Sequence, residues 1–282
     1  MSVKDRIIVL GDIHAMYEEA CFLLEHALLI DSNKHWIANN TSLIFLGDVC
    51  DRGYDSASMY RLIIELQKQA VLFNSEVLFI LGNHEIMESI GYNPYMSEEE
   101  ESGYQSAYLA FSPGGWLRNW LEMQNAVIKR GDFIFAHGDL PENLADRDME
   151  ELNREIMSDY MELDFQSQEK TSDHPLLFNS KQSIMWSRDA QSFMSPVYKD
   201  TLARFLARNN AKHYVCGHTP QEHGRFFVGH DNMYICIDTG MIFTRYYDSG
   251  SLSYLEIKDN KASAVYFDNG EDVPHYVELL EL

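Results

Sequence analysis

The sequence lacks the marks of a membrane protein or an exported one. No uninterrupted apolar run approaches the roughly 18–20 residues that a membrane helix needs, and the stretch 21–30 is broken by Glu25 and His26. Residues 1–6 lead directly into a strand-like run, with no apolar segment of the signal-peptide type before it. These absences predict a cytoplasmic protein without membrane contact.

Cysteine and basic residues are both scarce. The 4 cysteines form no CxxC pair and have no regular spacing, so we expect reduced, packed thiols. Lys and Arg number 22 against 44 Asp and Glu, which gives a net charge of −22. A field of that sign opposes nucleic acids and anionic membranes, because phosphate contacts need clustered cations. A small phosphate substrate remains compatible with it, because a metal centre reverses the local potential.

Linkers and repeats are missing as well. The 282 residues contain no Pro-, Gly- or Ser-rich linker, no internal repeat and no low-complexity tract. At roughly 100–200 residues per domain the length allows one or two domains, and the missing linker favours a single domain over 1–282.

Three strand-like apolar runs are each followed at once by a glycine and ligand-type side chains. We expect strands at 6–10, 42–46 and 76–81, with helices at 16–30 and from Asp55 or Ser56 to Ala70 between them. Open α/β sheets bind ligands at the carboxyl ends of their strands. The three following segments are Gly11-Asp12-Ile13-His14, Gly47-Asp48-Val49-Cys50-Asp51-Arg52-Gly53 and Gly82-Asn83-His84-Glu85.

In the second half of the chain, strand-like runs are again followed at once by ligand-type side chains. A strand at 132–136 ends at His137-Gly138-Asp139, a strand at 213–216 ends at Gly217-His218, and a strand at 233–237 ends near Asp238. Helices are expected over 146–165 and 197–209, a loop over 166–183, and a hairpin of 251–257 with 262–267 that closes the second half.

Between 88 and 130 the sequence no longer shows a clear alternation of strand-like and helix-like runs. Asn93-Pro94 is a turn signal, and 97–102 is a charge run that is typical of a solvated loop or the start of a helix. Because this region directly follows a segment of ligand-type residues, we expect a cap-like insertion at about 88–130 that covers the site and selects substrates.

The polar residues at the strand ends form a set suited to metal ions. Carboxylate, imidazole and amide ligands without thiolates suit Mn, Fe or Zn and argue against a structural zinc cage. Six ligands are too many for one catalytic ion and about right for two, with Asp48 as the bridge. Ions roughly 3.5–4 Å apart lower the pKa of a shared water and hold a phosphoryl group for in-line attack. The set is Asp12, His14, Asp48, Asn83, His137 and His218.

The neighbouring residues fit the cleavage of a phosphate ester. His84 follows Asn83 and is the predicted general acid, and Asp51 would keep that imidazole protonated and oriented. Arg52 and Arg188 are predicted to bind phosphate oxygens, as is Asn83 in addition to its role as a metal ligand. Arg188 has an alternative partner in Asp189.

This order of motifs resembles that of the phosphoprotein phosphatase family of metallophosphoesterases over roughly 6–250, and looks most like its Shewanella-like bacterial-type branch. The branch-like segments are Phe111-Ser112-Pro113-Gly114-Gly115-Trp116-Leu117, Met185-Trp186-Ser187-Arg188 and Cys216-Gly217-His218-Thr219-Pro220-Gln221.

The resemblance implies a four-layer αββα sandwich of the calcineurin-like type, with a dinuclear centre between its two sheets. One metal would be bound by Asp12, His14 and Asp48, and the other by Asp48, Asn83, His137 and His218. The same resemblance implies His84 as the acid with Asp51 as its partner, Arg52 and Arg188 on phosphate, and protein phosphatase activity that leans towards phosphotyrosine.

The chain departs from the family pattern at three positions. Ala15 stands where a glycine is usual, and it is tolerated at little cost only if its backbone is not at positive φ. Asp139 replaces the second glycine of the His-Gly motif and adds charge that would tune metal affinity or weaken phosphate binding. Cys50 replaces a larger apolar residue, which we expect to affect packing alone.

Three functions are therefore compared. The first is a dimetal phosphomonoesterase that acts on phosphoprotein or on a small phosphomonoester. The second is a dinucleoside polyphosphate hydrolase, for which a chain of charge −22 offers few cations near the site motifs. The third is a catalytically silent binding module, whose sequence sign would be a missing ligand, and no ligand is missing.

Overall fold

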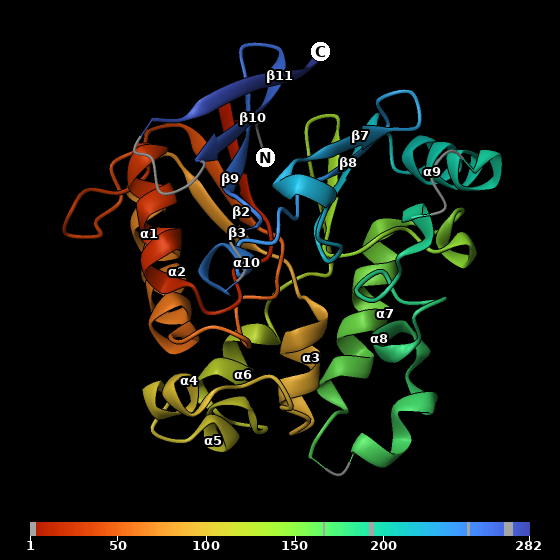
Figure 1. Cartoon of the computed structure of the whole chain (residues 1–282). Helices are drawn as coiled ribbons and strands as arrows, with labels where there is room; N and C mark the ends of the chain where they lie inside the picture. The colour runs from red at the N-terminus through yellow and green to blue at the C-terminus, as the bar shows by residue number, and fades with distance from the viewer. Residues whose placement is uncertain (1–3, 166, 192–194, 247–248, 268–272) are drawn as a thin grey trace.

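Two mixed β-sheets face each other at the centre of the protein (Figure 1). The computed structural model describes the chain except residues 1–3, 166, 192–194, 247–248 and 268–272. No helix within the described ranges is both long enough and apolar enough to cross a membrane.

The first sheet has the strand order β11-β10-β9-β1-β2-β3. Its strands β1, β2 and β3 are parallel, as predicted, with β3 at the edge, and β9 runs antiparallel beside β1. Our expectation that the 251–267 hairpin closes the second half is wrong, because β9 and β10 extend the first sheet next to the N-terminal strand. Alternation identifies a strand but not its neighbour in the sheet. The strands are β1 Arg6–Leu10, β2 Thr41–Phe45, β3 Glu76–Phe79, β9 Leu252–Lys258, β10 Lys261–Phe267 and β11 His275–Glu281.

The second sheet has the order β4-β5-β6-β8-β7, and β5, β6 and β8 are parallel. Three edge strands, β4, β7 and β11, were not predicted. β4 falls within the region we expected to be an insertion, β7 has only 3 residues, and β11 is mostly exposed, so its apolar pattern is weak. The strands are β4 Val127–Arg130, β5 Phe133–Ala136, β6 His213–Cys216, β7 Phe227–Gly229 and β8 Tyr234–Cys236.

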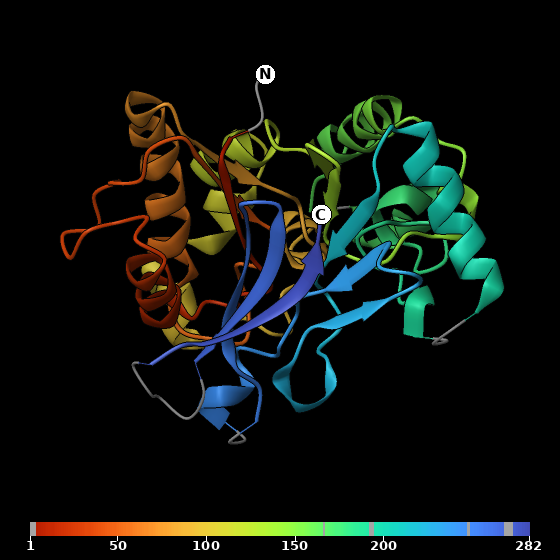
Figure 2. The same cartoon turned by 90° about the horizontal axis from the view of Figure 1, so that it is seen from above.

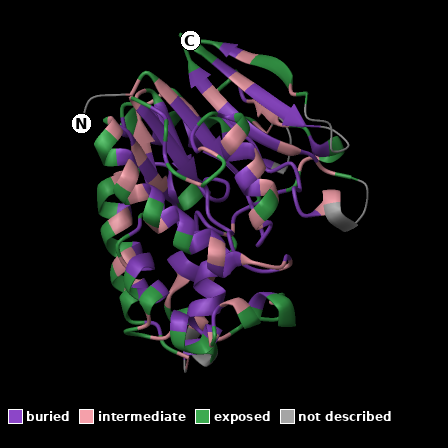
Figure 3. Cartoon of the chain, turned by 90° about the vertical axis from the view of Figure 1, so that its left-hand side faces the viewer, coloured by how far each residue is buried: buried purple, intermediate pink, exposed green. Residues whose placement is uncertain are grey.

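Each central strand is buried on both faces, which explains its continuous apolar sequence. In β1, Ile7 and Val9 join the core between the two sheets, and Ile8 and Leu10 join the core beneath the helices. Figure 3 shows this contrast between the buried strands and the partly exposed helices.

Helices cover the outer faces of both sheets. α1 (Tyr17–His26) packs on β9, and α2 (Ser56–Ala70) packs on β3. On the other side α7 (Met149–Met161) packs on β4, and α9 (Pro196–Arg208) packs on β6 (Figure 2). The order helix, sheet, sheet, helix confirms the αββα sandwich.

The helix boundaries differ from prediction where the backbone turns. α1 ends at His26 rather than near residue 30, because Leu28 has a left-handed φ of 54°. α2 begins as expected, since the Asp55 side chain accepts a hydrogen bond from Ser58 N. The predicted loop 166–183 contains the 3-10 segment Ser167–Asp173 and α8, Pro175–Phe178, with proline at its first turn.

Four short helices, α3 to α6, lie together at the lower end of Figure 1. α4 packs on α2 and starts at the predicted charge run, where Ser97 is its N-cap. Within this run Glu100 is fully buried, which we did not foresee. The helices are α3 Asn83–Ser89, α4 Glu98–Gly103, α5 Ala107–Phe111 and α6 Trp116–Leu121.

Candidate active site

The structure brings the six predicted ligands together at the carboxyl ends of strands from both sheets. Residues 12 and 14 follow β1, residue 48 follows β2, and residue 83 opens α3 after β3. Residues 137 and 218 follow β5 and β6 of the facing sheet. All six are buried: Asp12, His14, Asp48, Asn83, His137 and His218.

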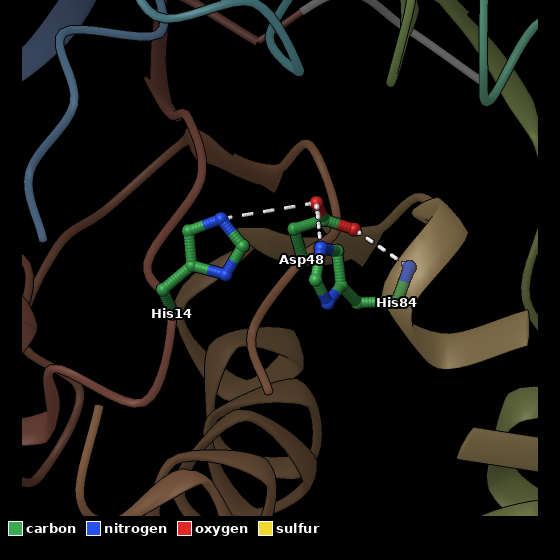
Figure 4. Close-up of side chains that lie close together, drawn as sticks. All are labelled: His14, Asp48 and His84. Atoms are coloured by element: carbon green, nitrogen blue, oxygen red, sulfur yellow. Dashed lines mark hydrogen bonds and ion pairs between the residues drawn. The ribbon is translucent and has the colours of Figure 1, made fainter. Parts of the chain in front are cut away.

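Asp48 lies at the centre of this set. Its Oδ2 is 3.9 Å from His14 Nε2 and 3.3 Å from His137 Nε2. Its Oδ1 accepts a hydrogen bond from the backbone N of His84 at 3.0 Å (Figure 4). Burial by itself raises the pKa of Asp48, but His137 and His84 reverse this and hold the pKa well below its ordinary value. The carboxylate is therefore ionised and shared by two groups of ligands.

The first ligand group joins Asp48 to Asp12 and His14. His14 Nδ1 lies 3.1 Å from the Cys50 carbonyl oxygen, so Nδ1 carries the proton and Nε2 presents a lone pair. That Nε2 is 3.9 Å from Asp12 Oδ2 as well as from Asp48 Oδ2. Asp12 is oriented through its other oxygen, which accepts from His218 N at 2.9 Å.

The second ligand group joins Asp48 to Asn83, His137 and His218. His137 Nδ1 donates to the Leu46 carbonyl at 2.7 Å, so its Nε2 lone pair points at Asn83 Oδ1, 3.0 Å away, and at His218 Nδ1, 3.2 Å away. His218 Nε2 in turn lies 3.2 Å from the Trp186 carbonyl. Lone pairs that converge in this way, with both imidazoles fixed from behind by a carbonyl, fit a bound cation.

The electrostatics of this group favour a positive charge. Burial by itself lowers the pKa of His137, but Asp48 and Asp12 raise it to about 9. The potential that attracts a proton to this imidazole would equally attract a metal ion. Nitrogen and oxygen ligands without sulfur are compatible with Mn, Fe or Zn.

His84 lies beside the ligands and is paired with Asp51. His84 Nδ1 is 2.5 Å from Asp51 Oδ2, and His84 Nε2 faces Asp48 Oδ2 at 3.7 Å. Burial lowers the pKa of His84, but Asp48 and Asp51 outweigh this effect and raise it. By distance alone His84 could join His14 and Asp48 around a metal, but Asp51 holds its ring through Nδ1, which is the orientation that the predicted general acid requires.

Both predicted arginines line the same cavity of about 350 Å³ as Asp48 and His84. The Arg52 guanidinium is 3.1 Å from His14 Nε2 and 3.0 Å from His84 Nε2. Arg188 donates to Thr219 Oγ1 at 3.0 Å. Asp189, the alternative partner considered for Arg188, accepts from Lys181. Two cations therefore face the space next to the ligands.

Glu85 organises the site, and sequence reasoning assigned it no role. Its carboxylate accepts hydrogen bonds from the backbone N of Gly82, Asp48 and Val49, at 2.9, 3.0 and 2.9 Å. This ties the turn after β2 to the turn after β3. Gly82 is required there, because a Cβ would come within 2.3 Å of Asp48 Oδ1. The signal was present, since Glu85 is the third residue of α3, where an acidic side chain caps free N–H groups.

Asp238 is a second buried carboxyl close to the predicted ligands, and the sequence alone indicates no role for it. Burial is the main cause of the raised pKa of Asp12, and the charge of Asp238 is the next largest. It therefore adds to the negative potential of the first ligand group. Its own side chain accepts from Gly240 N at 2.8 Å.

The structure shows the surroundings of the three positions at which the chain departs from the family pattern. Ala15 has a left-handed φ of 58°, so it carries the strain that a glycine would avoid. Three backbone hydrogen bonds hold it, from Ala15 N to Val49 O and from Tyr54 N and Asp55 N to Ala15 O. Cys50 is fully buried, as a packing residue would be.

The carboxylate of Asp139 is bonded away from the ligands. It accepts from Ala190 N at 2.7 Å and from Tyr234 OH at 2.5 Å. Burial raises the pKa of Asp139 to about 6. The added group thus links the turn after β5 to β8.

Known proteins with similar sequences are phosphoesterases and phosphatases. The calcineurin-like phosphoesterase profile matches residues 5–222. The chain is similar to Shewanella-like protein phosphatase 1 of Plasmodium berghei, 31% identical over 272 residues that cover 92% of this chain and 74% of the relative. It is also 25% identical to the bis(5'-nucleosyl)-tetraphosphatase PrpE of Oceanobacillus iheyensis, over 84% of this chain and 85% of that protein.

A solved structure has the same fold. The cold-active protein-tyrosine phosphatase of a psychrophilic Shewanella species superposes with a TM-score of 0.81 over 98% of this chain and 80% of that one. The sequence identity is 22%, so the similarity concerns the fold.

Proposed function

The chain belongs to the calcineurin-like phosphoesterase family, and we propose that it removes phosphate from phosphorylated side chains of proteins with the help of two metal ions. The observation that carries the proposal is Asp48, whose one buried carboxylate is shared by two converging groups of nitrogen and oxygen ligands. Beside them, one cavity contains the two arginines and the imidazole of His84 that a phosphoester needs.

Each residue has a part in the proposed reaction. Asp12, His14 and Asp48 would hold one ion, and Asp48, Asn83, His137 and His218 the other, with Mn, Fe or Zn as candidates. Such ions polarise a phosphoryl group and activate water. Arg52 and Arg188 bind and orient the phosphate oxygens, with Asn83 as a further contact. His84 protonates the leaving oxygen, and Asp51 holds its ring in place.

The surroundings of the cavity favour a protein substrate. Tyr92, Tyr95 and Trp186 line its walls next to the phosphate-binding arginines, so an aromatic ring would be surrounded by aromatic rings. We therefore propose that phosphotyrosine is preferred over phosphoserine. The region 88–130, which contributes both of these tyrosines, is the proposed cap.

An adjoining cavity of about 380 Å³ favours a polypeptide substrate over a polyanionic one. It shares Met87, Tyr92 and Trp186 with the first cavity, and none of the described residues that line it is charged. A dinucleoside tetraphosphate would need additional cations along its length. Uncharged walls instead suit the side chains of a peptide that flank the phosphorylated residue.

The decisive experiment offers the manganese-reconstituted protein matched phosphotyrosine and phosphoserine peptides and a dinucleoside tetraphosphate. We expect peptide hydrolysis, faster for phosphotyrosine. His84→Ala should lower kcat by about 100-fold or more while two metal ions remain bound. His35→Ala, which changes an exposed imidazole, is the matched control and should have no effect.

The other possible results of this experiment would support a different function. Preference for the tetraphosphate would support the polyphosphate hydrolase, to which the PrpE similarity also points. No turnover of any substrate with two metals bound would support a silent binding module. Full activity of His84→Ala would contradict the assignment of the acid.

A further inference from the structure

Glu88 is a buried carboxyl next to the pair formed by His84 and Asp51. It has no part in the proposed reaction. It lies four residues after His84 on α3, so the two side chains share one face of the helix. Both side chains are coupled to the same partner, because His84 Nδ1 is paired with Asp51 Oδ2 and Asp51 is, after burial, the main cause of the raised pKa of Glu88. Only 3% of the Glu88 surface is exposed.

Among the described residues, three buried carboxyl oxygens around Asp51 have no donor, namely Asp51 Oδ1, Glu88 Oε1 and Glu100 Oε2. Asp51 Oδ2 is paired with His84, but no N–H or O–H group of the described residues donates to Asp51 Oδ1. Glu88 Oε1 is buried and has no such donor either. Buried polar atoms are rarely left unpaired, and two ionised carboxylates in contact would repel each other. One proton between them removes both problems.

The neighbouring carboxyls identify Glu88 as the one that holds this proton. Glu85 accepts three backbone N–H groups and the Tyr60 hydroxyl, and Glu100 accepts Asp51 N and the Ser56 hydroxyl on Oε1 while its Oε2 has no donor. Glu88 has no comparable set of donors within the described part of the chain. Burial, followed by the charge of Asp51, raises the pKa of Glu88 to about 10.

We propose that Glu88 is protonated in the working enzyme and is a positioning residue, whose carboxyl donates a hydrogen bond to Asp51 Oδ1 and so fixes the carboxylate that orients His84. Asp51 is then held from both sides, by His84 on Oδ2 and by Glu88 on Oδ1. Because Glu88 is neutral, it orients Asp51 without adding a charge next to it. The inference rests on the proposed role of His84 as the acid.

The test compares a variant that keeps the donor with one that loses it. Glu88→Gln retains an N–H donor of the same length, and Glu88→Met has a similar volume without any donor. Phenyl phosphate and 4-nitrophenyl phosphate are the substrates, because the phenolate is the more basic leaving group and depends more on the acid.

We expect Glu88→Gln to remain within about threefold of the wild-type kcat on both substrates. Glu88→Met should lose about tenfold or more on phenyl phosphate and clearly less on 4-nitrophenyl phosphate, because only part of the acid contribution is lost. Metal content and the unfolding temperature are measured for both variants. An equal loss on both substrates, or a Gln variant as slow as the Met variant, would overturn the proposal.

His84→Ala separates this inference from the reaction on which it rests. If His84→Ala hydrolyses phenyl phosphate at the wild-type rate, the acid assignment itself is wrong. If it fails while Glu88→Met is fully active, only the role of Glu88 is wrong. An infrared difference spectrum of wild type and Glu88→Gln gives a second measurement that does not need the Met variant to fold. It should show a protonated carboxyl band that the Gln variant lacks, and its absence would refute the protonated state.

Discussion

Single residues of the site are held in backbone conformations that side chains normally avoid. His14, Asp48, Asp51, Arg52 and His218 have φ values of 49°, 50°, 71°, 71° and 66°. Left-handed backbone costs a non-glycine residue about 1 kcal/mol or more, and such strain is typical of functional positions. A glycine at any of these five positions would relieve the strain but would supply neither a ligand nor a charge.

Glu100 gives a prediction at this scale, because its buried carboxyl titrates within an accessible pH range. Burial, partly offset by Ser56 and Asp51 N, raises the pKa of Glu100 from 4.5 to about 7. The folded protein therefore binds this proton more tightly than the unfolded chain. The contribution of Glu100 to the free energy of unfolding is complete below about pH 4.5 and falls by about 3 kcal/mol as the pH rises through 7.

Glu100→Gln should remove this dependence, since the amide oxygen still accepts from Asp51 N while the charge is gone. Denaturant unfolding at pH 5 and pH 8 measures the effect. The difference in stability between the variant and the wild type should shift in favour of the variant at pH 8. A difference that is the same at both pH values would show that Glu100 does not titrate in this range.

At the scale of elements, a short segment holds the turn that carries Asp51 and Arg52. We call residues 95–100 the strap. Its Tyr95 carbonyl accepts from Arg52 N at 2.8 Å, its Ser97 hydroxyl donates to Gly53 O at 2.9 Å, and its Glu100 carboxylate accepts from Asp51 N at 2.8 Å. Three consecutive residues of the turn are thus bonded to the strap, which lies in the proposed cap. The strap therefore couples the cap to the position of Arg52.

Ser97→Ala tests this coupling, with Ser106→Ala as the matched control. Both serines cap a short helix, Ser97 by accepting from Glu100 N and Ser106 by accepting from Leu109 N. Each variant should lose about 1 kcal/mol of stability. Only Ser97→Ala also loses the bond to Gly53, so only it should weaken competitive inhibition by inorganic phosphate, by about threefold. Equal inhibition constants in the two variants would argue against a clamp.

At the scale of the whole molecule, the ligand groups connect the two sheets. Asp48 and Asn83 follow strands of the first sheet, and His137 and His218 follow strands of the second. The sheets otherwise meet through an apolar core that includes Val9, Phe135 and Val215. A metal ion held by both pairs of ligands would therefore oppose their separation on unfolding.

Manganese should accordingly stabilise the fold. At a free concentration about 100 times Kd, one bound ion adds about 3 kcal/mol to the free energy of unfolding. Thermal unfolding of chelator-treated protein with and without added manganese measures this as a rise in Tm. His137→Ala should lose most of the rise. If the variant and the wild type respond equally, the stabilising ion is bound elsewhere.

The sequence by itself determined the parts of this protein that are local in the chain. An apolar run, a glycine and a ligand-type side chain follow one another within a few residues, so β1, β2, β3, β5 and β6 and the residues after them were predictable. The order of these motifs was enough to indicate the family and the αββα fold. Asp55 as the cap of α2 was predictable for the same reason, since a cap acts within one turn.

Tertiary structure alone decided what depends on contacts between distant segments. The 251–267 hairpin pairs with β1 because its apolar residues complete the core between the sheets, and alternation cannot reveal a partner strand. Glu85, Glu88 and Glu100 look like ordinary surface acids in the sequence, yet all three are buried around the turns after β2 and β3. A carboxyl acquires its role from the donors and charges that folding places around it, and these come from residues far away in the chain.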